Sequence, residues 1–85
     1  MPRISMFFGI VIYMYYDDHN PPHFHASYEG LEGAFDFDGN LLKGYMLPRA
    51  QKLISEWCRM HSNELIENWR NIETDKPLNW IEPLR

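Results

Sequence analysis

Cysteine is almost absent from this sequence, since Cys58 is the only one among 85 residues. A single thiol cannot form an internal disulfide bond, and such sparse cysteine usage is typical of a reducing, cytoplasmic compartment. We expect Cys58 to be a half-buried small side chain on a helix rather than a nucleophile.

A long apolar run is also missing. The longest, Met6–Tyr16, is interrupted by Gly9 and ends at two aspartates, whereas a helix that spans a bilayer needs about 20 apolar residues. No small-residue cleavage site follows the run, so we expect neither a signal peptide nor a membrane contact. Its β-branched and aromatic residues predict a strand over Ile10–Tyr16 that is buried on both faces, with Arg3–Phe8 as its partner across a turn at Phe8-Gly9.

Positive charge is scarce in the first half of the chain. Residues 1–42 carry one base, Arg3, and six acids, a net charge of −5, whereas residues 43–85 carry seven bases and six acids, a net charge of +1. Three of the four histidines lie in the acidic half. The field of this half favours cations and opposes the phosphate backbone, so we expect no tight binding to nucleic acid.

The length of the chain allows one small domain, which we assign to residues 1–85. A TIM barrel or a doubly wound sheet does not fit. From Pro48 onward, apolar residues recur every three or four positions, which predicts one long helix over about 48–73 with a kink or break at Ser62-Asn63. The apolar tail 78–84 should pack back on the sheet.

The stretch 18–25 is the most unusual part of the sequence. Pro21-Pro22 hold their backbone φ at about −65°, so the segment that enters His23 is stiff and not helical. The seven residues that start at His23 alternate strictly between the two faces of a strand. His23 and His25 should therefore share one face, with Phe24 on the other.

A second hairpin is predicted from the next alternating run, 32–38. A two-residue loop at Gly30-Leu31, with glycine first, suits a type II′ turn, and its register sets apolar residues opposite one another. The predicted pairs are Phe24–Phe37, Ala26–Phe35 and Tyr28–Gly33 on the apolar face, and His23–Asp38, His25–Asp36 and Ser27–Ala34 on the polar face. After a turn, residues 41–43 form a short returning strand. The order of strands followed by a helix predicts an α+β domain in which a mainly antiparallel sheet of three to five strands packs on the C-terminal helix.

Several motifs together resemble a known family. They are Asp18-His19-Asn20-Pro21-Pro22-His23-Phe24-His25, Leu47-Pro48-Arg49, Trp57, Glu64-Leu65-Ile66-Glu67-Asn68-Trp69 and Ile81-Glu82-Pro83-Leu84. In these the chain is similar to small bacterial proteins grouped as domain of unknown function 4160, over nearly its whole length. The resemblance implies a link to toxin–antitoxin-like gene pairs, and it supplies no catalytic residues to transfer to this sequence.

The histidines and carboxylates predict a divalent metal site as one hypothesis. Two imidazoles on one strand face with a carboxylate across from them would form a two-histidine, one-carboxylate set. The candidate ligands are His19, His23, His25, Glu29, Asp36 and Asp38. The alternative is a polar sheet face in solvent, whose histidines are partnered by aspartates.

The same groups also suit general acid–base chemistry. A histidine held by a carboxylate transfers protons near neutral pH, which is the equipment of a small ribonuclease. The candidate catalytic residues are His23, His25, Asp36 and Asp38. The acidic surroundings argue against this activity, because they repel the phosphate that a ribonuclease must hold.

Aromatic residues make up 15% of the chain. A domain of this size cannot bury all of these large rings, so some of them are expected at an interface. The leading functional hypothesis is therefore a cytoplasmic protein-interaction module that binds a protein partner or forms a homo-oligomer.

Overall fold

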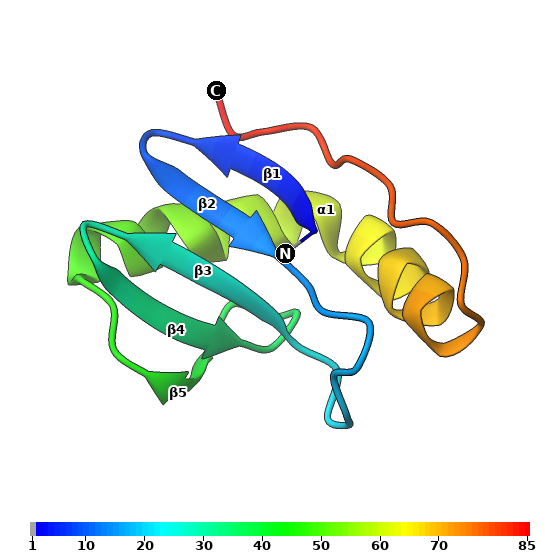
Figure 1. Cartoon of the computed structure of the whole chain (residues 1–85). Helices are drawn as coiled ribbons and strands as arrows, with labels where there is room; N and C mark the ends of the chain where they lie inside the picture. Colours follow the sequence, from blue (N-terminus) through cyan, green and yellow to red (C-terminus); the bar gives the residue numbers. More distant parts are fainter. Residues whose placement is uncertain (1) are drawn as a thin grey trace.

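One antiparallel sheet and one long helix make up the fold (Figure 1), and the computed structural model describes residues 2–85. The sheet has the strand order β1-β2-β3-β4-β5, so that every strand pairs with its neighbours in sequence. The elements are β1 (Arg3–Phe7), β2 (Ile10–Tyr13), β3 (Phe24–Tyr28), β4 (Leu31–Phe35), β5 (Leu41–Gly44) and α1 (Pro48–Glu73). The predicted α+β class, with five strands and a C-terminal helix, is confirmed.

The first hairpin follows the prediction closely. β1 and β2 are joined at Phe8 and Gly9, whose φ angles are 51° and 82°. Two positive φ angles are what a type I′ turn requires, and the twist of that turn matches the twist of the strands. β2 ends at Tyr13, three residues earlier than predicted, because the chain bends into a local turn in which the amide of Asp18 donates to the carbonyl of Tyr15 (3.2 Å).

The second hairpin corrects the predicted register. Its turn residues are Glu29 and Gly30, with φ angles of 51° and 78°, rather than Gly30-Leu31. The observed pairs are Phe24–Phe35, His25–Ala34, Ala26–Gly33, Ser27–Glu32 and Tyr28–Leu31. The shift is two residues, which leaves every side chain on its predicted face, so the alternation of polar and apolar residues cannot detect it.

This correction moves the two predicted carboxylate neighbours away from the histidines. Asp36 and Asp38 lie beyond the end of β4, in the turn that leads to β5, and neither pairs with β3. Phe24 stacks on Phe35 with ring centroids 5.7 Å apart and also on Phe37 at 6.3 Å. Both phenylalanines therefore still stack on Phe24, because Phe35 lies directly opposite it in the ladder and Phe37 lies diagonally from it.

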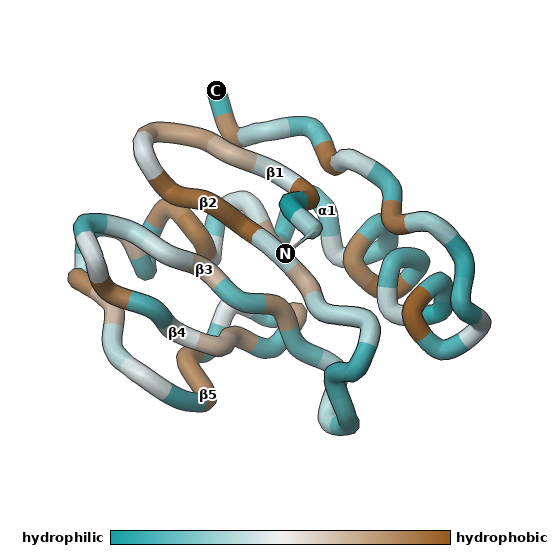
Figure 2. Tube along the Cα trace, viewed as in Figure 1, coloured by the Kyte–Doolittle hydropathy of each residue, from teal (hydrophilic) through white to brown (hydrophobic). Residues whose placement is uncertain are grey.

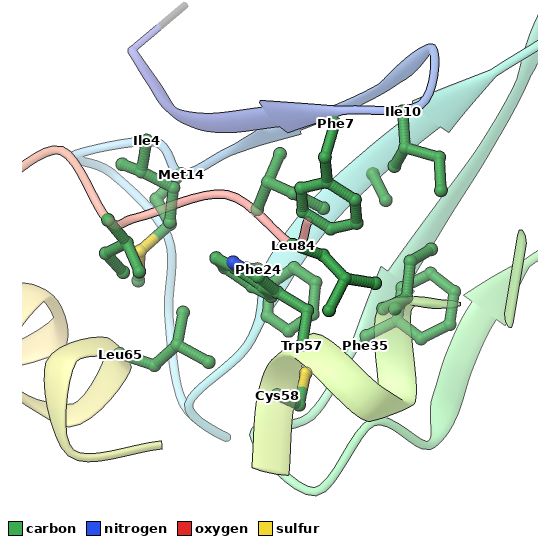
Figure 3. Close-up of a cluster of buried hydrophobic side chains, with 14 of the residues drawn as sticks. Ile4, Phe7, Ile10, Met14, Phe24, Phe35, Trp57, Cys58, Leu65 and Leu84 are labelled. Atoms are coloured by element: carbon green, nitrogen blue, oxygen red, sulfur yellow. The ribbon is translucent and has the colours of Figure 1, made fainter. Parts of the chain in front are cut away.

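The helix buries its apolar stripe against one face of the sheet. Trp57 is fully buried and lies against Phe24, with ring centroids 5.7 Å apart, and against Phe7 at 5.5 Å. Figure 3 shows these rings among the buried side chains of the core, which also include Leu65. Trp69 meets Phe37 edge-on at 6.3 Å. Trp57 and Trp69 thus contact phenylalanines of the sheet, and the predicted packing of the sheet on the C-terminal helix is confirmed.

A break divides α1 into two segments, visible in Figure 1 as a change of direction. His61 has non-helical dihedral angles, φ −129° and ψ 23°, one residue before the predicted position at Ser62-Asn63. The Nδ1 of His61 lies 2.6 Å from a carboxylate oxygen of Glu64 at the start of the second segment.

The C-terminal tail packs back on the domain, as predicted. It runs beside β1 (Figure 1), where the amide of Ile81 donates to the carbonyl of Ile4 at 2.7 Å. The buried side chain of Asn68 makes two hydrogen bonds to the backbone of Asn79. Its Nδ2 donates to the carbonyl of Asn79 (2.9 Å), and its Oδ1 accepts from the amide of Asn79 (2.8 Å). Ile81 is fully buried, so the tail completes the core at this edge.

Candidate metal centre

The loop between β2 and β3 brings a carboxylate to the start of β3. This loop is the hydrophilic segment that extends below the sheet in Figure 2. Within it, the backbone amide of Tyr15 donates to the Oδ2 of Asp18 at 3.2 Å, and the amide of Asp18 donates to the carbonyl of Tyr15. These two bonds hold the Asp18 side chain in a fixed position in front of the strand.

Asp18, His23 and His25 converge on one point. The Nε2 of His25 lies 3.2 Å from the Oδ2 of Asp18, and the Nε2 of His23 lies 3.5 Å from its Oδ1. One ligand atom from each of the three residues lies within 4.8 Å of the other two. The two imidazole rings meet edge to face, with centroids 5.0 Å apart. We call these three residues the His₂Asp cluster.

A backbone carbonyl defines the tautomer of His23. Its Nδ1 lies 2.7 Å from the carbonyl oxygen of Pro21, and a carbonyl can only accept, so Nδ1 must carry a proton. In the neutral ring, Nε2 is then a lone pair that faces the carboxylate of Asp18. Two electron-rich atoms this close repel each other unless a cation lies between them. That cation is either a proton on His23 or a metal ion.

Aromatic rings enclose the cluster. His25 stacks on Tyr13, with centroids 5.4 Å apart and planes at 15°, and it meets the edge of Tyr15 at 5.0 Å. His23 lies against Trp69, with ring centroids 5.6 Å apart. The side chains of Asp18, His23 and His25 are 13%, 15% and 22% exposed, so the cluster is shielded but still open to solvent.

Tyr13 provides a rigid support for His25. Its hydroxyl donates to the Oε1 of Glu32 at 3.1 Å. Burial, followed by the nearby Glu32 carboxylate, raises the pKa of Tyr13 well above its ordinary value. Tyr13 therefore remains a neutral donor at any physiological pH, and its ring is held in place beneath the imidazole of His25.

The structure gathers only part of the set of candidate ligands. His23 and His25 lie together on one side of β3, as the alternation predicts, and Phe24 points into the core with no exposed surface. The candidates that do not join them are His19, which is exposed in the loop, Glu29, which lies in the hairpin turn, and Asp36 and Asp38, which lie in the turn after β4.

Asp18 is the candidate ligand that sequence reasoning missed. It belongs to the distinctive stretch 18–25, but it lies five residues before His23 and outside the strand alternation. The one available signal was that Asp18 lies in the loop that joins two strands. Such a loop has to return to the strand that follows it, and loops often carry functional residues.

Cys58 takes no part in the cluster. It is fully buried in α1, rather than half-buried as predicted. Loss of solvation raises the pKa of the thiol to about 12, with a smaller contribution from Asp36 and Asp38. A protonated, buried thiol is neither a nucleophile nor a metal ligand, so the prediction of a structural role agrees with the structure.

Together the fold and this cluster define a small α+β domain with two histidines and one aspartate at the entrance to its third strand. The chain belongs to the family described as Domain of unknown function (DUF4160), whose model matches residues 9–70. That match contains the whole His₂Asp cluster and confirms the resemblance found in the sequence. Searches of curated proteins and of solved structures gave no significant match.

In the part of the chain that the structure describes, α1 is too polar to cross a lipid bilayer.

Proposed function

We propose that this protein binds a divalent transition-metal ion through the Nε2 atoms of His23 and His25 and the carboxylate of Asp18. The observation that carries the proposal is the position of the His23 ring, whose Nδ1 lies 2.7 Å from the Pro21 carbonyl oxygen while its Nε2 faces a carboxylate oxygen of Asp18 at 3.5 Å. A second hydrogen bond that orients a ligating histidine is a regular feature of metal centres. The acidic half of the chain adds a field that attracts cations.

The ligand set indicates which ions fit. Two imidazoles and one carboxylate suit Zn²⁺, Fe²⁺, Co²⁺ or Ni²⁺ better than Ca²⁺ or Mg²⁺, which prefer oxygen ligands alone. Three protein ligands leave at least one coordination position for another molecule, as in catalytic rather than structural zinc sites. The proposed site is therefore one at which a metal ion binds and reacts, and not a staple that holds the fold together.

Metal analysis of the untagged protein, purified without a chelator, tests this proposal. We expect about one equivalent of a transition metal per chain, and Co²⁺ binding to the metal-free protein that weakens at least about 100-fold in His23→Ala or Asp18→Asn. His19→Ala is the matched control, because this exposed histidine lies in the same loop outside the cluster. Absence of stoichiometric metal, or equal weakening in all three variants, would overturn the proposal.

We also propose that β5 is the surface through which the protein associates with a second copy of itself. The other edge of the sheet, β1, is covered by the tail, whereas no strand within residues 2–85 pairs with the outer edge of β5. Leu42, within β5, and Tyr45, directly after it, are 49% and 57% exposed. An unpaired edge with apolar side chains favours the addition of another strand.

Light scattering over a concentration series tests this association. We expect a dimer at high concentration that dissociates in Leu42→Glu, because the new carboxylate would be buried beside an identical one. Met60→Glu is the control, since Met60 is 62% exposed on the helix and away from the sheet edge. A wild-type protein that stays monomeric at every concentration contradicts the proposal.

The prediction of a partner in a toxin–antitoxin-like gene pair and the prediction of a ribonuclease both rest on the sequence. If the ribonuclease hypothesis holds, His23 or His25 is the proton-transfer group, and Asp18 replaces Asp36 and Asp38 as the carboxylate beside it.

A further inference from the structure

The indole N–H of Trp69 has no hydrogen-bond acceptor among residues 2–85, although the side chain is 94% buried. Buried donors in proteins are almost always bonded, to the protein, to water or to a ligand. Trp57 follows this rule, since its Nε1 donates to the carbonyl of Glu82 at 3.0 Å. Trp69 is therefore the exception of the two buried tryptophans, and a water molecule or a bound ligand would have to supply the acceptor that residues 2–85 do not.

Trp69 lies beside the His₂Asp cluster. Its ring packs against His23, with centroids 5.6 Å apart and planes at 52°, and on another side it meets the ring of Phe37. Of the two buried tryptophans, the one without an acceptor is thus the one that contacts a proposed metal ligand. The unsatisfied donor therefore belongs to a ring that borders the cluster, whose three protein ligands would leave coordination positions open.

The charge balance of the cluster favours an anion at such a position. A divalent ion bound by two neutral imidazoles and one carboxylate keeps a net charge of +1. The surrounding rings of Tyr13, Tyr15 and Trp69 exclude much of the solvent, which strengthens the attraction of that charge for an anion. An indole N–H adds a neutral donor that favours an anionic acceptor.

We propose that the metal centre takes a small anion as its exogenous ligand, and that the Nε1–H of Trp69 donates a hydrogen bond to this anion. The inference rests on the proposed metal site and adds to it the class of the additional ligand and the residue that selects it. Trp69 would be a binding residue of the centre without being a metal ligand.

Azide binding to the Co²⁺-loaded full chain tests this role. We expect azide to change the visible Co²⁺ spectrum of the wild-type protein. In Trp69→Phe the affinity for azide should fall about 10-fold, as expected for one lost hydrogen bond to a charged group, while the affinity for Co²⁺ stays within about 3-fold. Trp80→Phe is the matched control, because Trp80 is 56% exposed, and it should behave as the wild type.

An NMR measurement on the wild-type protein keeps the test valid if Trp69→Phe does not fold. In the Zn²⁺-loaded protein, addition of azide should shift the indole N–H signal of Trp69 and leave those of Trp57 and Trp80 in place. If Co²⁺ and Zn²⁺ do not bind, the proposed metal site and this inference both fail. If the metal binds but azide does not, the whole inference is wrong and the metal site stands. If azide binds but shifts no Trp69 signal, or binds the folded phenylalanine variant equally well, only the role of Trp69 is wrong.

Discussion

At the scale of single residues, His23 shows how a neighbouring carbonyl determines what an imidazole can do. The carbonyl of Pro21 accepts a hydrogen bond from Nδ1–H, so in the neutral ring the other nitrogen, Nε2, presents a lone pair to Asp18. A histidine on the same strand without that contact would be free to present a proton instead. The nitrogen of His23 that carries the proton therefore depends on a backbone group two residues away, as well as on the side chains of the cluster.

Cys58 leads to a prediction at the same scale. Because burial raises the pKa of its thiol to about 12, and only the thiolate reacts, we expect modification by a disulfide reagent at pH 8 to be at least about 100-fold slower in the native protein than in denaturant. The rate of thionitrobenzoate release, with and without guanidinium, measures this difference. Rapid modification of the native protein would show that the helix opens around the thiol.

At the scale of elements, the turn between β4 and β5 depends on one carboxylate. The side chain of Asp36 accepts hydrogen bonds from the amide of Asp38 (3.0 Å) and from the amide and side chain of Asn40 (2.9 and 3.1 Å). Gly39, with φ at 88°, lies against Ser55 of α1, where an added Cβ would be 2.8 Å from the Cα of that serine. The turn thus joins the sheet to the helix, and a side chain at Gly39 would separate them.

Asp36→Ala should lower the free energy of unfolding by about 1–2 kcal/mol at pH 7. This loss is smaller than that expected for hydrogen bonds to a buried charged group, because the carboxylate of Asp36 is partly exposed to solvent. Desolvation raises the pKa of Asp36, but the hydrogen bonds from Asn40, Asp38 and Gly39 outweigh it and hold the pKa below its ordinary value of 3.8. A lowered pKa means that the stabilisation is complete above the unfolded pKa and is lost as the pH falls through the folded one.

Urea unfolding between pH 7 and pH 2 measures this effect. The difference between wild type and Asp36→Ala should be constant above about pH 5 and should shrink as the pH falls toward 2. Asp38→Ala is the control, since only the backbone amide of Asp38 takes part in the turn. A difference that does not change with pH would show that the ionised carboxylate is not what stabilises the turn.

At the scale of the whole molecule, the sheet and the helix form two layers that differ in charge. The sheet and its loops carry the acidic first half of the chain, and α1 carries acids and bases in equal number. The helix covers one face of the sheet (Figure 1), and the His₂Asp cluster lies at the start of β3, within the acidic half of the chain. This arrangement favours a cation at the cluster and disfavours a polyanion.

We therefore expect no tight binding to duplex DNA. A fluorescence titration at low salt should give at most weak affinity, because a net charge of −5 on residues 1–42 repels the phosphate backbone. A submicromolar dissociation constant with a steep dependence on salt concentration would contradict this expectation. Metal-loaded protein is the appropriate second sample, since a bound divalent ion changes the local charge.

Local patterns in the sequence were sufficient for the elements of this fold. The period of the apolar residues predicted the helix from Pro48 to Glu73, and the tight turn at Phe8-Gly9 predicted the first hairpin. Both depend on contacts between residues that are close in the chain. The alternation around His23 and His25 likewise placed both rings on one side, because it follows from the geometry of a single strand.

Two features were decided only by the tertiary structure. The register of the second hairpin has two solutions that place each residue on the same face, and both allow Phe24 to stack on Phe35 and Phe37. The observed register is the one whose turn lies at Glu29 and Gly30, both with positive φ. The carboxylate of the cluster is Asp18, because the loop after β2 folds back on β3, and the path of a loop through space depends on all the contacts it makes. Sequence thus determined which side of the strand carries the histidines, and tertiary packing determined which acid meets them.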